Sequence, residues 1–181
     1  MGRFLNPGNV GFQQIIKPKT YVDKTGILAY LNEWIDTDSR FVCVSRARRF
    51  GKTVAARTIR AYYDKSCDSH DLFAPYEIAR DPSYEEHINK YDVIGLDVQS
   101  FFLLDDDPQA FIKRLETAVL EEVCAKWSDI DGLKDMRLVN ALIKVHETTG
   151  AKFVFVIDEW DAVFRYYPKD DALQKKWIHF L

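Results

Sequence analysis

The sequence is poor in the features that mark secreted, metal-binding and membrane proteins. Its 181 residues include only three cysteines. Cys43, Cys67 and Cys124 are widely spaced and form no CxxC pair, which argues against a disulfide framework or a zinc site. The first residues, MGRFLNPGNVGF, lack the apolar stretch of a secretion signal, and no later run reaches the ~18 apolar residues of a membrane helix. These absences favour a reducing, cytoplasmic location with no membrane segment.

A strong excess of charge is also missing. The net charge is −3, so no global basic field indicates binding to nucleic acid or to a membrane surface. Arg46, Arg48 and Arg49 form a local basic cluster, but for each arginine alone solvent exposure or pairing with a carboxylate is the simpler interpretation. What the chain does have is 47% hydrophobic residues, enough to bury one sizeable core.

Short apolar runs alternate with helical patterns along the chain. A strand buried on both faces of a parallel sheet is expected at 41–45 (FVCVS), a second strand at 91–99 and a third, buried strand at 153–157. The order of elements predicts an α/β fold in which helices cover both faces of that sheet. Residues 1–20 are expected to be irregular, with a short strand near YVD. Helices are expected at about 25–34, capped by Thr25, and at 52–63, 107–127, 134–148 and beyond 170. Asp107 is expected to cap the third of these helices, and Gly150 is expected to end the fourth in the left-handed conformation.

The segment SRARRFGKTVAAR (45–57) follows the first expected strand. In a phosphate-binding loop, backbone N–H groups surround the phosphate, and the next helix directs its positive end toward it. Gly51 would let the backbone approach closely, Lys52 would bridge the β- and γ-phosphates, and the Thr53 hydroxyl would hold Mg²⁺. The glycine expected five residues before Gly51 is Arg46, so the loop alone is equally compatible with a turn that contains GKT by coincidence.

A second motif, FVFVIDEWD (153–161), ends an expected strand in two carboxylates. Asp158 would lie near the metal ion, and Glu159 would polarise the water that attacks the γ-phosphate. An acidic turn at a strand end is common, but both motifs in this order favour a nucleotide site. The expected site residues are Arg48, Arg49, Phe50, Gly51, Lys52, Thr53 and Val54 for the nucleotide, Thr53 and Asp158 for the metal, and Glu159 for catalysis.

With these motifs the chain resembles the predicted AAA-ATPase-like family of bacterial proteins. Members of that family carry a YVDKT segment, a loop of the form RPRRFGKS and a strand ending in IDEYD. The counterparts here are YVDKT at 21–25, RARRFGKT at 46–53 and IDEWD at 157–161. The resemblance implies that Arg46 belongs to the family's own form of the loop. Ala47 departs from it, because it replaces a proline and removes a fixed φ.

The resemblance implies an ATP-binding P-loop NTPase fold of the additional-strand type, with Mg²⁺ as cofactor and with Asp23 and Lys24 near the nucleotide. It also implies a sensor strand after residue 181 and a C-terminal nuclease-like region. We therefore expect residues 1–40 to form an N-terminal extension and 41–181 to form a nucleotide-binding core that is incomplete at its C-terminus. The unpaired sheet edges of such a core favour association with another chain or a second copy.

Three functions remain open. The first is an ATP-binding module that hydrolyses ATP with Mg²⁺ and drives an effector outside this chain. The second is a non-hydrolysing nucleotide-binding or interaction switch, which Ala47 and the incomplete sheet favour. The third is a metal-dependent nuclease built from Asp97, Asp105, Asp106 and Asp158, although Asp105 to Asp107 are better explained as the acidic start of a helix.

Overall fold

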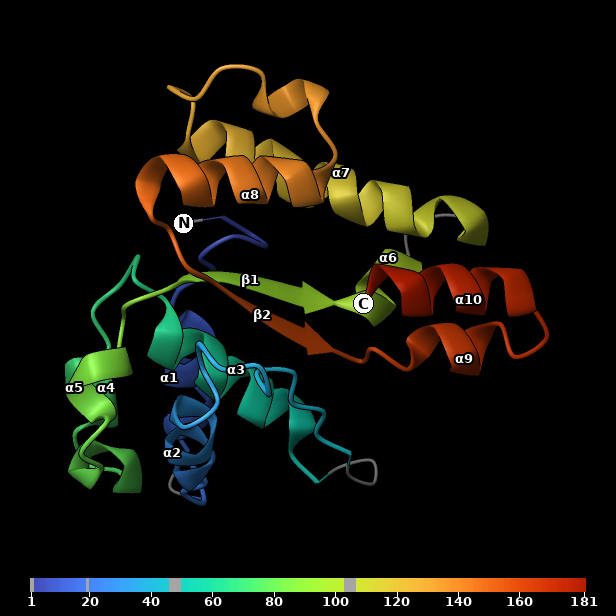
Figure 1. Ribbon diagram of the computed structural model, residues 1–181. Helices are drawn as coiled ribbons and strands as arrows, with labels where there is room; N and C mark the ends of the chain where they lie inside the picture. Colours follow the sequence, from blue (N-terminus) through green and yellow to red (C-terminus); the bar gives the residue numbers. More distant parts are fainter. Residues whose placement is uncertain (1, 19, 46–49, 103–106) are drawn as a thin grey trace. The chain divides into compact units, whose positions relative to one another are not determined.

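The computed structural model describes residues 2–18, 20–45, 50–102 and 107–181 (Figure 1). The chain folds into two compact units, which we call unit 1 (residues 6–93) and unit 2 (residues 2–5 and 94–181). Their boundary falls inside strand β1 (Asp92–Asp97). The expected division between residues 40 and 41 stays a prediction. Of the residues singled out in the sequence, Arg46 to Arg49, Asp105 and Asp106 lie outside the described residues.

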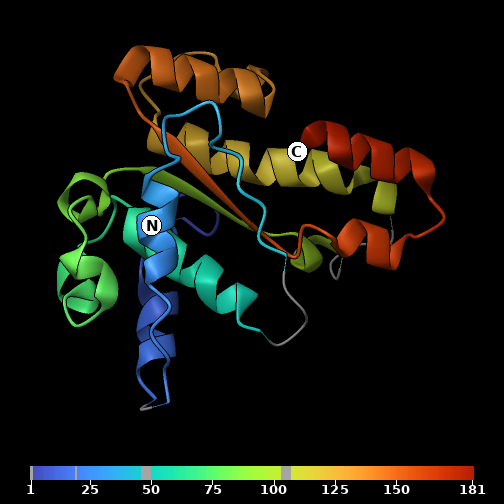
Figure 2. The same cartoon turned by 60° about the horizontal axis from the view of Figure 1, so that its bottom comes forward.

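Unit 1 is built from short helices around one longer helix, α3. Its elements are α1 (Val10–Ile16), α2 (Gly26–Asn32), α3 (Lys52–Tyr63), α4 (His70–Phe73), the 3₁₀ turn η1 (Glu77–Arg80) and α5 (Tyr84–His87). Helix α3 has the bounds expected from the sequence, and α1 packs against it (Figures 1 and 2). The expected irregular start is wrong over α1, a seven-residue helix too short to show periodicity. No strand forms near YVD.

Thr25 precedes α2 as expected, but it does not cap the helix. Its side chain makes no capping hydrogen bond. Instead the buried Thr25 hydroxyl accepts a hydrogen bond from the backbone N–H of Ile78 (3.2 Å). This hydrogen bond therefore joins the start of α2 to η1. Because its two partners are far apart in the sequence, no local sequence pattern predicts it.

The interior of unit 1 combines aromatic rings with buried polar side chains. The ring of Phe12 stacks on that of Phe73, with centroids 4.6 Å apart, and Tyr62 meets Phe73 edge-on at 5.4 Å. The buried polar or charged residues of unit 1 are Asn6, Asn9, Thr25, Asn32, Thr58, Asp64, Ser69, His87 and Asp92. Burial of so many polar groups is tolerated only where each finds a hydrogen-bond partner.

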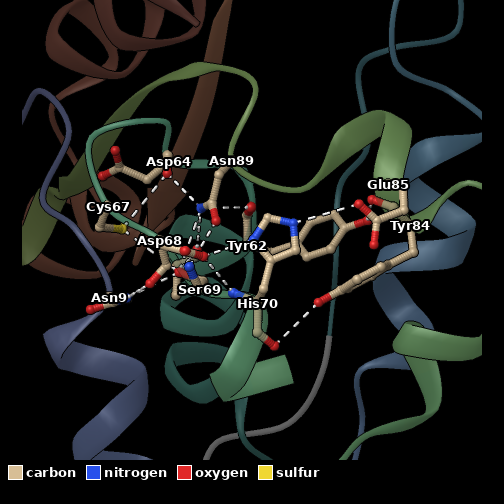
Figure 3. Close-up of polar contacts among 11 residues, drawn as sticks. Asn9, Tyr62, Asp64, Cys67, Asp68, Ser69, His70, Tyr84, Glu85 and Asn89 are labelled. Carbon is tan, nitrogen blue, oxygen red and sulfur yellow. Dashed lines mark hydrogen bonds and ion pairs between the residues drawn. The ribbon is translucent and has the colours of Figure 1, made fainter. Parts of the chain in front are cut away.

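Asp64, Ser69 and Asn89 form the centre of the largest of these polar networks (Figure 3). The fully buried Asp64 carboxylate accepts hydrogen bonds from the backbone N–H groups of Gly8 (2.6 Å) and Ser66 (2.8 Å). Asn89 donates through its side-chain amide to the Asp64 carbonyl (2.6 Å) and accepts from the Ser69 N–H (2.8 Å). The network fixes the chain entering α1 and the turn leaving α3.

The expected strand at 41–45 is wrong. Residues 41–45 take no regular secondary structure, and Phe41 is 80% exposed. Val42 and Val44 are also exposed. An apolar run becomes a buried strand only where neighbouring strands accept its hydrogen bonds, and within the described residues no strand pairs with this segment.

Unit 2 contains helices and a small sheet. Its helices are α6 (Val98–Phe102), α7 (Phe111–Lys126), α8 (Leu138–Thr149), α9 (Ala162–Tyr166) and α10 (Asp171–Phe180), with 3₁₀ turns at Pro108–Ala110 and Leu133–Asp135. Asp107 caps the first of these turns by accepting from the Gln109 N–H (2.9 Å), and Gly150 ends α8 with a φ of +70°. Both residues were predicted to mark these helix ends.

The described residues form a two-stranded sheet in which β1 and β2 (Phe153–Asp158) run parallel, as the arrows in Figure 1 show. The fold is therefore mixed α/β. Strand β1 is buried over Asp92 to Leu96, but β2 is only partly buried, and Phe155 is 49% exposed. The expectation that 153–157 is a buried strand is thus wrong in part, since only Val156 of these five residues is buried.

The core of unit 2 is almost entirely apolar. Helices α7 and α8 lie side by side and contribute most of it (Figures 1 and 2). Fully buried members include Ile94, Phe111, Leu115, Val119, Val123, Val145 and Trp177. The segment 2–5 is held by Glu122, whose carboxylate accepts from the N–H groups of Arg3, Phe4 and Leu5 at 2.6–2.9 Å. None of the helices in the described part of the chain is both long and apolar enough for a bilayer.

Candidate functional site

The predicted phosphate loop lies in unit 1, at the start of α3. Gly51 has φ +83° and ψ 23°, in the left-handed region that favours glycine. A Cβ at this position would meet no atom closer than 3.8 Å, so the backbone angle and not crowding requires glycine. The Gly51 carbonyl accepts the first helical hydrogen bond, from Ala55 N–H (2.9 Å). The helix thus begins at the residue directly after the Gly51 turn.

The residues after Gly51 occupy the first turn of α3. Lys52 is the first helical residue and is partly buried, Thr53 is exposed, and Val54 is partly buried. Phe50, just before the turn, is 66% exposed. No acidic residue lies in this first turn. The positive end of a 12-residue helix, an ammonium group and a hydroxyl therefore come from consecutive residues, which suits an anion with an attached metal ion.

A second lysine of unit 1 lies beside this turn. The Nζ atom of Lys24 is 3.8 Å from the point that a Cβ on Gly51 would occupy. Its backbone is held by the preceding residue, since the Asp23 carboxylate accepts from the N–H groups of Thr25 and Glu77, each at 2.8 Å. Only the family resemblance had suggested Lys24, and the approach to Gly51 comes from the folding of α2 and η1.

The predicted acidic motif lies in unit 2, at the end of β2. Asp158 is the last residue of the strand and is 9% exposed. Its carboxylate accepts from the Glu159 N–H (3.0 Å), and among the described residues it forms no ion pair. A carboxylate buried to this degree is costly without a cation. Asp158 therefore offers carboxylate oxygen atoms of the kind that bind a cation.

Glu159 begins the turn after β2 with φ +54°, an uncommon angle for a residue with a long side chain. Such strain often occurs at functional positions. Its carboxylate forms an ion pair with the Arg165 guanidinium, which also contacts Asp161 at 3.1 Å. Sequence reasoning missed Arg165. The Asp161–Arg165 spacing of i, i+4 at the start of a helix was the available signal.

Trp160 and Trp177 support this turn from within unit 2. The indole N–H of the fully buried Trp177 donates to the Trp160 carbonyl (2.8 Å). The turn is also closed by a hydrogen bond from the Ala162 N–H to the Glu159 carbonyl (2.9 Å). The position of Glu159 is therefore set by packing of α10 against the residues after β2.

The two residues predicted to hold a metal are, each taken separately, of types that suit magnesium better than a softer metal. Asp158 and Thr53 offer oxygen atoms, which Mg²⁺ prefers, and Mg²⁺ commonly takes one or two protein ligands with phosphates and water as the others. The described residues contain no cluster of three or more His, Cys, Asp or Glu side chains suited to a metal. Cys43, Cys67 and Cys124 are free thiols. A cation site built by protein side chains alone is thus absent from the described ranges.

The nuclease hypothesis finds little support in the described residues. Asp107 is explained by its helix cap, and Asp97 ends β1 with an exposed side chain. Asp105 and Asp106 lie outside the described part of the chain. The polar network around Ser69 and Asn89, as far as the structure describes it, also contains no group of three or more side chains suited to a metal. Its hydrogen bonds are made to backbone groups of unit 1 (Figure 3).

Comparison with known proteins gives one match. A family model described as a predicted AAA-ATPase matches residues 8–181. No curated protein and no solved structure matches the chain. The match spans both motifs and both units, and it supports nucleotide binding as the general activity.

Proposed function

The chain belongs to the predicted AAA-ATPase family, and we propose that it binds ATP at the Gly51 turn and hydrolyses it with Mg²⁺. The observation that carries this proposal is the start of α3. There a left-handed glycine is followed at once by a lysine and a threonine in the first turn of a 12-residue helix.

Phosphate binding is assigned to unit 1. The N–H groups at the start of an α-helix have no acceptor within the helix, and in the proposed site those of the first turn of α3 donate to phosphate oxygens. Lys52 supplies an ammonium group for the β- and γ-phosphates. Phe50, Gly51 and Val54 supply backbone at the same turn, and Arg48 and Arg49 add positive charge near it. These roles explain why a glycine with φ +83° stands here.

Metal and water chemistry is assigned to Thr53 and to the end of β2. Thr53 and Asp158 would hold the magnesium ion, which when bound neutralises charge on the phosphates. Glu159 orients and polarises the attacking water. Its carboxylate is paired with Arg165, so hydrolysis requires that Glu159 leave this pair or share it with water.

Calorimetric titration with ATP and Mg²⁺, together with phosphate release, tests the proposal. Lys52→Ala should weaken ATP binding by about 100-fold, the loss expected for a charge-assisted contact with the phosphates. Glu159→Gln should leave binding intact and reduce hydrolysis by about 100-fold or more. Lys90→Ala and Glu147→Gln, both at exposed positions, are the matched controls. A folded wild-type protein that produces no heat with ATP would contradict the proposal.

The second candidate function is a non-hydrolysing nucleotide switch. The ion pair between Glu159 and Arg165 favours it, because the guanidinium competes with a catalytic water molecule for the carboxylate. This candidate predicts ATP binding that is lost in Lys52→Ala, but no phosphate release from the wild type. Phosphate release that disappears in Glu159→Gln would rule it out.

Coupling to an effector is part of the same proposal. A nuclease-like region, another protein or a second copy of this chain would receive the conformational change that ATP binding drives. Increased ATP turnover on adding the partner, absent in Lys52→Ala, is the expected signature. Light scattering with and without ATP tests association of this chain with itself.

A further inference from the structure

The YVDKT segment of unit 1 brings a second ammonium group to the Gly51 turn. The Nζ atom of Lys24 lies 3.8 Å from the Cβ position of Gly51, in ordinary van der Waals range of that turn. Among the described residues, Lys24 forms no hydrogen bond or ion pair through its side chain. Its positive charge is therefore not neutralised by a neighbouring carboxylate.

The backbone that presents Lys24 is firmly held. Asp23 accepts one N–H from Thr25 and one from Glu77, each at 2.8 Å, and the Thr25 hydroxyl accepts a third from Ile78. Burial acts to raise the pKa of Asp23, but the hydrogen bonds from Glu77 and Thr25 outweigh it, so the pKa lies below its ordinary value. The ionised Asp23 thus anchors the segment on η1.

A lysine in this place adds positive charge to a helix end that already carries partial positive charge. The turn is the N-terminal end of α3, which carries partial positive charge, and Lys52 adds a full charge next to it. Cations are normally favoured at the opposite end of a helix. A third positive group fixed at this end is explained if a polyphosphate fills the space and interacts with all of them.

We propose that Lys24 is a second phosphate-binding residue, which contacts the polyphosphate chain of the nucleotide at the Gly51 turn. The inference rests on the proposed function of the Gly51 turn. Asp23 is its positioning residue, since it fixes the backbone from which Lys24 extends. Lys24 recognises charge on the phosphates and makes no contribution to recognition of the base.

Binding of ATP and of inorganic tripolyphosphate, each with Mg²⁺, tests this assignment by calorimetric titration. Lys24→Gln should weaken binding of both ligands by about 10-fold, as expected for one lost charge-assisted contact at a solvent-accessible site. Lys24→Arg should retain most of the affinity. The matched control Lys90→Gln, at another exposed lysine of unit 1, should bind both ligands like the wild type.

Asp23→Asn should produce a smaller loss, about 3-fold for both ligands, because it loosens the support and keeps the ammonium group. Salt dependence gives a second measure, since Lys24→Gln should reduce the loss of affinity that salt causes in the wild type. Lys24 is exposed, so its variants are expected to fold, and circular dichroism checks this for each variant.

The outcomes separate this inference from the proposed function. If Lys24→Gln binds both ligands like Lys90→Gln while Lys52→Ala binds neither, the inference about Lys24 is overturned and the proposed function stands. If Lys24→Gln loses affinity for ATP and keeps it for tripolyphosphate, Lys24 contacts the nucleoside and the inference is again overturned. If the wild type binds neither ligand, the result contradicts both the inference about Lys24 and the proposed function.

Discussion

The two units of this chain have interiors of different kinds. In the described residues, Asp158 alone among the buried polar or charged side chains belongs to unit 2, and all the others lie in unit 1. The large apolar cluster that includes Phe111, Leu115 and Trp177 lies wholly in unit 2. Buried hydrogen bonds and aromatic contacts thus hold the interior of unit 1 together. The interior of unit 2 is held together by the packing of apolar side chains.

This difference predicts different tolerance to substitution. Apolar packing accepts side chains of similar volume at small cost. A buried hydrogen-bond network does not, because each removed partner leaves another polar group unsatisfied. The Gly51 turn, which is the proposed phosphate loop, belongs to the unit with the more directional interactions. The experiments below test that contrast, from the largest expected effect to the smallest.

Alkaline pH should unfold unit 1 before unit 2. Desolvation by burial raises the pKa of Tyr84 and of Tyr91 to about 12, and it raises the pKa values of Tyr62 and Tyr63 further. Because these folded-state pKa values lie above the ordinary value of 10.0, the neutral phenols stabilise unit 1 fully below pH ~10, and this stability is lost as the pH rises toward 12.

Tyrosinate absorbance and tryptophan fluorescence, followed together during an alkaline titration, test this prediction. Trp34 reports on unit 1, and Trp127 and Trp177 report on unit 2, so single-tryptophan variants separate the two signals. Tyr91→Phe should move the unit 1 transition to higher pH, because it removes one of the titrating groups. Loss of the unit 2 signal at a lower pH than that of unit 1 would contradict the prediction.

Asp64→Ala should destabilise unit 1 by about 4 kcal/mol, because two backbone N–H groups lose their charged acceptor in a fully buried place. Asp64→Asn, which keeps one acceptor oxygen, should cost about half as much. Urea denaturation gives the free energies of unfolding. Asp71→Ala, at an exposed position of unit 1, is the control and should change the free energy by less than ~0.5 kcal/mol.

Leu115→Ala should destabilise unit 2 by about 3 kcal/mol, because it leaves a cavity at a fully buried position of α7. Leu115→Met, which conserves volume, should cost less than ~1.5 kcal/mol. The decisive comparison is between Leu115→Met and Asp64→Asn. If the two interiors differ as described, Leu115→Met lowers the free energy of unfolding by less than Asp64→Asn does. Equal costs for the two conservative variants would remove the proposed difference between the interiors.

Glu159→Gly should leave the stability of unit 2 unchanged or raise it by up to about 1 kcal/mol, because glycine adopts φ +54° without strain. ATP hydrolysis should be lost in the same variant. Glu147→Gly, in the exposed face of α8, is the matched control and should destabilise by about 1 kcal/mol. A clear drop in stability on Glu159→Gly would show that the Arg165 ion pair outweighs the backbone strain.

Local signals in the sequence were sufficient for several elements of the fold. The bounds of α3, the cap at Asp107 and the left-handed Gly150 depend on neighbours within a few residues, and all are confirmed. The segment 41–45 was misread because strand formation depends on a pairing partner, which an apolar run does not reveal. Thr25 and Asn89 were missed as network residues since their partners lie far away in sequence.

The candidate site shows the same division between local sequence signals and long-range contacts. The motif spacing singled out Gly51, Lys52 and Thr53, and Gly51 has the left-handed conformation that favours glycine, while the binding roles of the three residues stay predictions. The pairing of Glu159 with Arg165 and the approach of Lys24 to Gly51 come from tertiary packing. Whether Arg48 and Arg49 contact nucleotide stays a prediction.

Trp160 follows Glu159 directly and is 39% exposed, while its carbonyl is held by the buried Trp177. An indole at that position is a natural optical reporter, because its emission responds to water and to nearby charge. Movement of the neighbouring carboxylate during turnover would thereby be visible in real time, with no dye attached to the protein.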